Sequence, residues 1–135
     1  HAIRRGTTEA KAIALLGRPG RFCAGFHLPT MAESPTSARD LLGKGAQLGL
    51  QVYEAPVPVV IGCTGHALAM GAILLMCADL RIGVEGPYKI GLNEVAIGMP
   101  MPEFVIAPSF SSGTPMTAHA DTAGCRERAF STSVE

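Results

Sequence analysis

The sequence has no surplus of charge of either sign, because 11 Lys and Arg side chains balance 11 Asp and Glu side chains. Its only adjacent basic pair is Arg4-Arg5, which we expect to lie in a solvated turn. Proteins that bind nucleic acid neutralise phosphates with clustered Lys and Arg. The sequence therefore argues against a nucleic-acid partner.

Metal-ligand spacing is also lacking. The four cysteines, at positions 23, 63, 77 and 125, form no Cys-x-x-Cys pair, and no histidine stands beside them at ligand spacing. We therefore expect no metal site. An even number of cysteines would permit disulfides, but a chain of this size does not need them. We expect reduced, mostly buried thiols in a cytoplasmic protein.

Long hydrophobic runs are missing as well. The longest, Ala67 to Ala78, falls short of the roughly 20 residues that a membrane-spanning helix needs, so it predicts a helix buried within the protein. No signal peptide is visible. The chain opens on His1 without an initiator Met, which suggests a fragment or an interior reading frame.

What is present is a globular composition, with 47% hydrophobic residues in 135 positions, enough for one domain. Short apolar runs alternate with helical patterns, which predicts an α/β fold with covered sheets. The segment 29–35 is expected to be a loop, and Thr36 or Ser37 to cap the helix that follows. The expected strands are 11–17, 59–63, 79–83 and 88–91, and the expected helices are 36–52 and about 66–77.

The composition changes after Phe104. From Ala107 to the end, Pro, Ser, Thr and Gly dominate without a sustained period of 2 or 3.6. We therefore expect a folded core over residues 1–106 and a disordered or poorly packed tail over 107–135.

Two small-residue segments, Ala24-Gly25-Phe26 and Leu68-Ala69-Met70, stand at the entries to helical stretches. The first N–H groups of a helix have no intrahelical acceptor and carry partial positive charge, so they can stabilise an oxyanion. The alternative for either segment is ordinary strand-to-helix packing. A nucleotide loop is disfavoured, since Gly62-Cys-Thr-Gly65 fits neither the Gly-x-Gly-x-x-Gly nor the Gly-Lys-Ser/Thr pattern.

Three motifs in order resemble those of the crotonase (enoyl-CoA hydratase/isomerase) superfamily, over about residues 11–105. That family is a spiral of ββα units, assembled as trimers or dimers of trimers, and its members are about twice as long. The resemblance thus implies a spiral that is incomplete at both ends. The three segments are Phe22-Cys-Ala-Gly-Phe-His-Leu28, Pro58 to Ile82, and Tyr88-Lys-Ile-Gly-Leu-Asn-Glu-Val-Ala-Ile-Gly98.

The resemblance also implies a site for an acyl-CoA thioester, with coenzyme A arriving as part of the substrate and no separate cofactor. The backbone N–H groups of Phe26 and Met70 would form the oxyanion hole, and Glu94 would exchange protons with the acyl chain. The coenzyme A groove would be lined by Ala24, Gly25, Phe26, His27 and Leu28. The alternative for Glu94 is a plain carboxylate at the start of a helix.

One departure separates two family activities. Hydratases of the family carry a second glutamate where this chain has Ile73. Water addition divides its proton transfers between two carboxylates, whereas moving a double bond needs one base. The sequence therefore resembles the Δ3,Δ2-enoyl-CoA isomerases more than the hydratases. A hydratase and an inactive remnant that binds acyl-CoA weakly are the alternatives.

Two further departures bear on the site. His27 stands where the family has Asp, and Met70 where it has Gly. His27 could be a second proton-transfer group, although a structural role is the commoner one for a lone histidine. We expect His66 to be packed, Glu103 to lie at the surface, and the side chains of Met70, Met76, Met99 and Met101 to fill the core.

Overall fold

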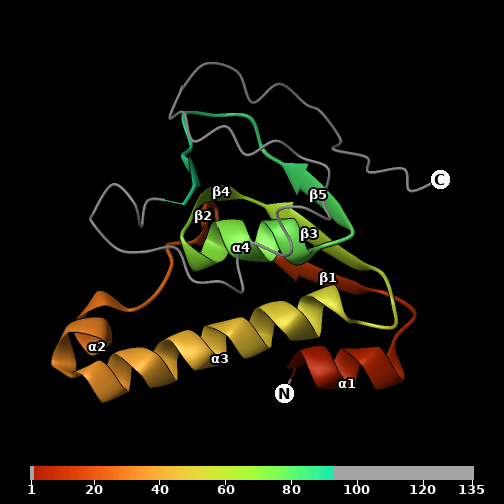
Figure 1. The fold of residues 1–135 in the computed structure, drawn as a ribbon. Coiled ribbons are helices and arrows are strands. Elements are labelled where there is room, and N and C mark those ends of the chain that lie inside the picture. Colours follow the sequence, from red (N-terminus) through yellow and green to blue (C-terminus); the bar gives the residue numbers. More distant parts are fainter. Residues whose placement is uncertain (1, 93–135) are drawn as a thin grey trace.

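The structure, a computed structural model, describes residues 2–92. Helix α1 (Ala2–Glu9) comes first, and pairs of strands then alternate with helices (Figure 1). The predicted tail, 107–135, lies outside the described residues, as do Glu94, Glu103, Met99 and Met101. The remaining elements are β1 (Ile13–Leu16), β2 (Gly20–Cys23), α2 (Leu28–Glu33), α3 (Pro35–Tyr53), β3 (Val59–Cys63), β4 (Gly65–Leu68), α4 (Met70–Cys77), β5 (Leu80–Gly83) and β6 (Ile90–Gly91).

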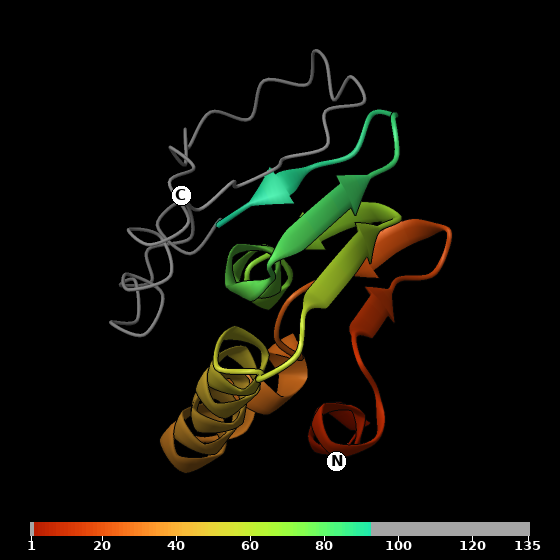
Figure 2. The same cartoon turned by 90° about the vertical axis from the view of Figure 1, so that its right-hand side faces the viewer.

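Each strand pair gives one strand to each of two parallel, three-stranded sheets, ordered β1-β3-β5 and β2-β4-β6. In the first sheet Ile13 pairs with Val59, and Val60 with Leu80. Figure 2 shows β1, β3 and β5 side by side. Parallel neighbours need a crossover connection, and α2 with α3, then α4, supply the two crossovers. The described chain is thus a spiral of ββα units, as the resemblance implied.

Strand β2 contains an irregularity that matters for the site. Gly20 pairs with Gly65 and Arg21 with His66, but Cys23 pairs with Ala67. The register therefore shifts by one residue within β2, as it does at a β-bulge. Beyond the shift, each residue of the first unit lies beside the residue 44 positions later in the chain, instead of 45.

Helix α4 is the centre of the core. All eight of its residues are buried, as expected of a helix that is apolar on every side. It lies between α3 and the β2-β4-β6 sheet (Figure 1). Strand β3 adds the alternating inward side chains Val59, Ile61 and Cys63. No helix among residues 2–92 is both long enough and apolar enough to span a membrane.

The predicted start of this helix at about His66 is wrong. Residues 65–68 form strand β4, and the helix begins only at Met70. β4 is held on both sides, by β2 and by β6. An apolar run of this kind cannot distinguish a buried strand from a buried helix by its periodicity alone, so the sheet contacts decide.

The prediction of a loop over 29–35 is wrong as well. Helix α2 occupies part of it, with Pro29 in its first turn, where proline is tolerated. Helix α3 then begins with Pro35 and is capped by Ser34, not by Thr36 or Ser37. The Ser37 N–H donates to the Ser34 Oγ at 3.0 Å, which satisfies one of the free donors of the first turn.

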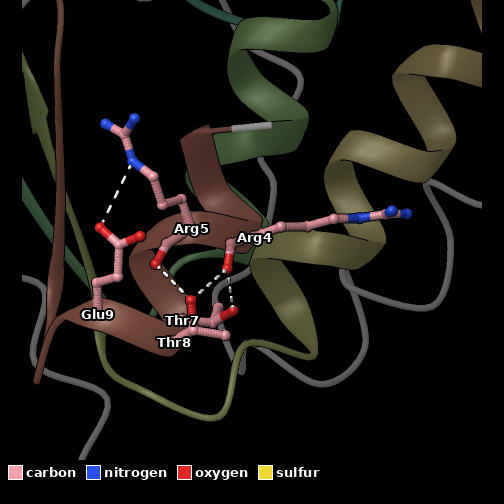
Figure 3. A network of polar contacts seen from close by, with 5 residues as sticks. All are labelled: Arg4, Arg5, Thr7, Thr8 and Glu9. Atoms are coloured by element: carbon pink, nitrogen blue, oxygen red, sulfur yellow. Dashed lines mark hydrogen bonds and ion pairs between the residues drawn. The ribbon is translucent and has the colours of Figure 1, made fainter.

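The Arg4-Arg5 pair lies in helix α1, not in the turn that we expected. Figure 3 shows its polar contacts: the Thr7 Oγ1 donates to the Arg4 carbonyl at 2.7 Å, and the Arg5 Nε lies 3.7 Å from a Glu9 carboxylate oxygen. Both members of this ion pair are exposed, so it contributes little to stability. The buried Ile3 instead anchors the helix.

The end of α4 is tied to the first sheet by two polar contacts. The Asp79 carboxylate accepts a hydrogen bond from the Val59 N–H at 2.7 Å. The Arg81 guanidinium donates to the Leu75 carbonyl, near the C-terminus of the helix, at 3.0 Å, where a cation opposes the helix dipole. Burial lowers the pKa of Arg81, and the Asp79 carboxylate acts against that shift.

Two glycines of α3 predict opposite effects on stability. A Cβ at Gly45 would lie 2.5 Å from Phe26 Cε1 and 3.2 Å from Met70 Sδ, whereas a Cβ at Gly43 would meet no described atom within 4 Å. We expect Gly43→Ala to raise the unfolding free energy by about 0.5–1 kcal/mol through helix propensity. Gly45→Ala should lower it by about 1–3 kcal/mol through overpacking. Urea titrations measure both, and equal shifts of one sign would contradict the packing at Gly45.

Candidate active site

The first predicted donor turn follows directly from strand β2. Its central residue, Gly25, has φ of +98°, a conformation that glycine adopts without a Cβ clash. Ala24 before it is exposed and Phe26 after it is half-buried. The turn therefore places a backbone segment at the surface while anchoring the side chain that follows it.

The second predicted donor turn joins β4 to α4. Ala69 has φ of +51° and ψ of −116°, and it is the one non-glycine residue with positive φ among residues 2–92. Such strain persists where the surrounding structure imposes it. Here the Ala69 N–H donates to the Gly91 carbonyl at 3.0 Å, and Met70 then opens the helix. The Met70 N–H is thereby one of the first-turn donors without an intrahelical acceptor.

These two turns touch each other. A Cβ at Gly25 would lie 2.8 Å from Ala69 Cβ and 3.2 Å from the Leu68 carbonyl oxygen. Two residues after Ala69, a Cβ at Gly71 would lie 2.6 Å from the Cys23 carbonyl oxygen. The residues that precede Phe26 and Met70 therefore stand side by side, although 44 positions separate them in the chain. That juxtaposition is what two donors to one oxyanion require.

The side chains of both predicted donors point toward α3. The Phe26 ring and the Met70 sulfur lie against Gly45, and the Met70 Cε lies near Gly49. Met70 is buried, which confirms that its side chain fills the core, as does the burial of Met76. Only the backbone of positions 26 and 70 is thus left for a ligand. Gly45 and Gly49 are four residues apart, one turn of a helix, and that spacing was the available signal in the sequence for this contact.

The rest of the predicted coenzyme A groove lies at the surface. His27 is exposed, and its Nδ1 lies 2.9 Å from the Thr30 Oγ1 within the same short helical segment. Leu28 is 68% exposed. The stretch from Ala24 to Leu28 is therefore accessible along one continuous piece of chain. The hydrogen-bond partner of His27 is the nearby Thr30, and no carboxylate among the described residues contacts either side chain.

Position 73 is the most informative side chain of α4. Ile73 is 1% exposed and belongs to the core cluster, with its Cγ2 facing Gly49 of α3. The predicted acid and base, Glu94, lies outside the described residues. Among residues 2–92 no group of three or more His, Cys, Asp and Glu side chains is placed to hold a metal ion.

His66 is half-buried on β4, in keeping with the expected packed role, but it also makes polar contacts that the sequence did not indicate. Its Nδ1 accepts a hydrogen bond from the Lys89 N–H at 2.9 Å. Its ring meets the Tyr88 ring edge-on, with centroids 5.5 Å apart and an interplanar angle of 89°. The residue therefore joins β4 to the segment before β6.

The thiol of Cys77 is chemically quiet. Burial raises its pKa from 9.0 to about 11, and the Arg81 guanidinium acts against that shift. The reactive thiolate is thus scarce near neutral pH. We expect iodoacetamide at pH 8 to label Cys77 only after unfolding, as read by mass spectrometry. Rapid labelling of the folded chain would contradict the burial.

The same pKa predicts how stability changes in alkaline solution. Because the folded-state pKa lies above the unfolded-state value, the stabilisation is fully present below pH 9 and is lost as the pH rises to about 11. The unfolding free energy of the wild type should therefore fall more steeply over this range than that of Cys77→Ala.

Comparisons with known proteins agree with this arrangement. The family model described as Enoyl-CoA hydratase/isomerase matches residues 2–118. Mitochondrial enoyl-CoA delta isomerase 1 of Mus musculus is 33% identical over 86 residues, which are 62% of this chain and 30% of that protein. A probable enoyl-CoA hydratase of Rhodobacter capsulatus is 33% identical over 85 residues, 62% of this chain and 33% of that protein. The chain thus spans about a third of the curated relatives' length.

The solved structures to which the chain is similar carry the same family name or one of its two activities. An enoyl-CoA hydratase/isomerase family protein from Pseudomonas syringae superposes with a TM-score of 0.78 at 38% identity, over 82% of this chain and 48% of that one. Human mitochondrial delta3-delta2-enoyl-CoA isomerase superposes with a TM-score of 0.74 at 27% identity, over 79% of this chain and 43% of that one. The chain therefore spans somewhat less than half the length of these two solved structures.

Proposed function

This chain belongs to the enoyl-CoA hydratase/isomerase family, and we propose that it moves the double bond of a 3-enoyl-CoA thioester to the 2 position. Glu94 is the single acid and base of this proposal. The two backbone donors are the N–H groups of Phe26 and Met70. Coenzyme A enters as part of the substrate, along the accessible stretch from Ala24 to Leu28.

The reaction needs one base and one oxyanion site. Glu94 takes a proton from C2, and the electron pair of that C–H bond moves through the C2–C1 bond to the thioester oxygen. The resulting dienolate carries its negative charge on that oxygen, where two N–H donors stabilise it. Glu94 then returns the proton to C4, and the double bond lies between C2 and C3. No water is consumed and no redox partner is required.

The contact between the two turns supports the oxyanion part of the proposal. Gly25 and Ala69 touch through the space where a Cβ at Gly25 would stand, so the next residue in each turn presents its N–H in the same neighbourhood. The side chains of those next residues, Phe26 and Met70, pack against α3. Preorganised backbone donors of this kind need no rearrangement when charge develops on the substrate.

The observation that carries the choice of an isomerase is the side chain at position 73. Hydratases of the family have a second glutamate there, and this chain has an isoleucine that is 1% exposed within the core. An alkyl side chain in that place cannot hold or deprotonate a water molecule. A single-carboxylate proton shuttle needs no such group.

A pair of substrates tests the proposal. We expect the purified chain to convert 3-hexenoyl-CoA to 2-hexenoyl-CoA at least about tenfold faster than it hydrates crotonyl-CoA, a difference of about 1.4 kcal/mol in barrier height. Incubation in H₂¹⁸O should leave the isomerised product unlabelled. Efficient hydration of crotonyl-CoA, with ¹⁸O in the product, would replace the isomerase by a hydratase.

The similarity to the probable hydratase of Rhodobacter capsulatus keeps the hydratase as the second candidate. A chain that binds the thioester without turning it over would show a melting transition raised by acyl-CoA, since a ligand that binds only the folded state stabilises it. The absence of either product would distinguish such a chain from an enzyme.

A further inference from the structure

Strand β6 is only two residues long, and its backbone pairing with β4 is correspondingly sparse. The Ala67 N–H donates to the Lys89 carbonyl and the Ala69 N–H to the Gly91 carbonyl, each at 3.0 Å. The second of these bonds holds the strained residue that precedes the proposed Met70 donor. Whatever fixes β6 against β4 therefore fixes the geometry of the donor turn.

We propose that His66 is a positioning residue for the Met70 donor, acting through its hydrogen bond to the Lys89 backbone; this inference rests on the proposed function. The His66 Nδ1 accepts the Lys89 N–H at 2.9 Å. This contact adds a side-chain hydrogen bond to the backbone bonds that hold the β6 segment against β4. His66 thus holds Lys89 by a hydrogen bond, Lys89 leads through Ile90 to Gly91, and the Gly91 carbonyl accepts the hydrogen bond of the Ala69 N–H.

Only one form of the imidazole can make this contact. An acceptor Nδ1 carries no proton, so a neutral ring bears its proton on Nε2, and a doubly protonated ring can only donate. Protonation of His66 would therefore remove the contact and place a cation against an N–H group. This contact, which we call the His66 latch, therefore requires a neutral ring.

The groups around His66 are cationic or neutral. Arg21 of β2 occupies the paired register position on one side, and Lys89 lies on the other. The Tyr88 ring packs against the imidazole, and helix α4 contains no charged residue. Among the described neighbours no carboxylate contacts the imidazole, and the polar partner that the structure gives His66 is the Lys89 N–H.

Three variants separate the acceptor from simple packing. His66→Leu keeps an apolar contact for Tyr88 but removes the acceptor. His66→Asn keeps an acceptor on the atom that takes the place of Nδ1. Tyr88→Leu, the matched control, removes the ring contact and leaves the acceptor in place. Amide hydrogen exchange of Lys89 and Ala69 is measured without substrate, and kcat and KM are measured with 3-hexenoyl-CoA.

For His66→Leu we expect the protection of both amides to fall about tenfold, the effect of one lost hydrogen bond. We expect kcat to fall about tenfold, since a slightly misplaced donor weakens the oxyanion, with KM within about twofold. His66→Asn should restore both to within about threefold.

Several outcomes would overturn the inference. Wild-type protection of Lys89 in His66→Leu would mean that no latch exists, and lost protection with an unchanged kcat would mean that it positions nothing. Failure of His66→Asn to restore either quantity would exclude the acceptor as the cause. If the wild type isomerises nothing, the proposed function fails, and the exchange of the Ala69 amide then tests the latch by itself. Lower Ala69 protection in His66→Leu, with recovery in His66→Asn, would support the latch. Unchanged protection in His66→Leu would overturn it.

Discussion

Replacing Glu94 by glutamine is expected to lower kcat for the isomerisation of 3-hexenoyl-CoA by about 10²–10⁴-fold, the usual contribution of a positioned general acid and base. An amide has nearly the shape of the carboxylate but cannot accept a proton from C2. The coenzyme A part of the substrate is bound by other residues in the proposal, so KM should stay within about threefold. Coupled spectrophotometric detection of the 2-enoyl product measures both constants.

The chain offers a matched control for this variant. Glu103→Gln makes the same chemical change in the same stretch of sequence, at a carboxylate that we expect at the surface, and should leave kcat within about twofold. Exchange of the C2 proton with deuterated solvent gives a second measure of the base. Equal, small effects of the two substitutions would remove Glu94 from the reaction.

Replacing Gly25 by alanine is expected to lower kcat by about 10²-fold, comparable to the loss of one oxyanion donor. The new methyl group would stand 2.8 Å from Ala69 Cβ and 3.2 Å from the Leu68 carbonyl oxygen, so the two turns must separate. Because Phe26 and Met70 follow these residues directly, both N–H groups would move away from the common oxygen. Steady-state kinetics with 3-hexenoyl-CoA should therefore show a lower kcat with a nearly unchanged KM.

Backbone strain alone has its own control. Gly20 also has positive φ, +79°, but a Cβ there would meet no described atom within 4 Å. Both alanine variants should lose about 1 kcal/mol of stability, because the conformation is unfavourable for any residue with a Cβ. Gly25→Ala should lose about 1–3 kcal/mol more through its clash with Ala69. Only Gly25→Ala should lose its rate. A similar fall in kcat for Gly20→Ala would assign the effect to stability and not to the contact between the turns.

Much of the fold could be predicted from the sequence. The run Val59 to Cys63 is β-branched and apolar, and it forms the central strand of its sheet with alternate residues buried. The strands near residues 13 and 80 and the long helix ending at Tyr53 were likewise predicted close to their positions. These elements carry their own signals, since propensity, period and turn residues agree.

Two of the errors have a common cause. Strand β4 and helix α1 are set by their neighbours: β4 by hydrogen bonds to two other strands, and α1 by the burial of Ile3. The positive φ of Ala69 also had no sequence signal, because alanine is not a residue that favours it. The motifs located the candidate donors, but the contact between Gly25 and Ala69 depends on the register of strands far apart in the chain.

The one-residue shift in β2 also limits where this chain can change length. Phe26 and Met70 differ in position by 44, the spacing that holds after the shift and not before it. If the same residues paired without the shift, Phe26 would lie opposite position 71. The two amides would then be out of step by one strand residue, roughly 3.3 Å, more than the length of a hydrogen bond. Insertions in the connection after β5 leave this phase intact, whereas a residue inserted between Arg21 and Phe26 would have to be absorbed by a second irregularity for the pair to stay in phase.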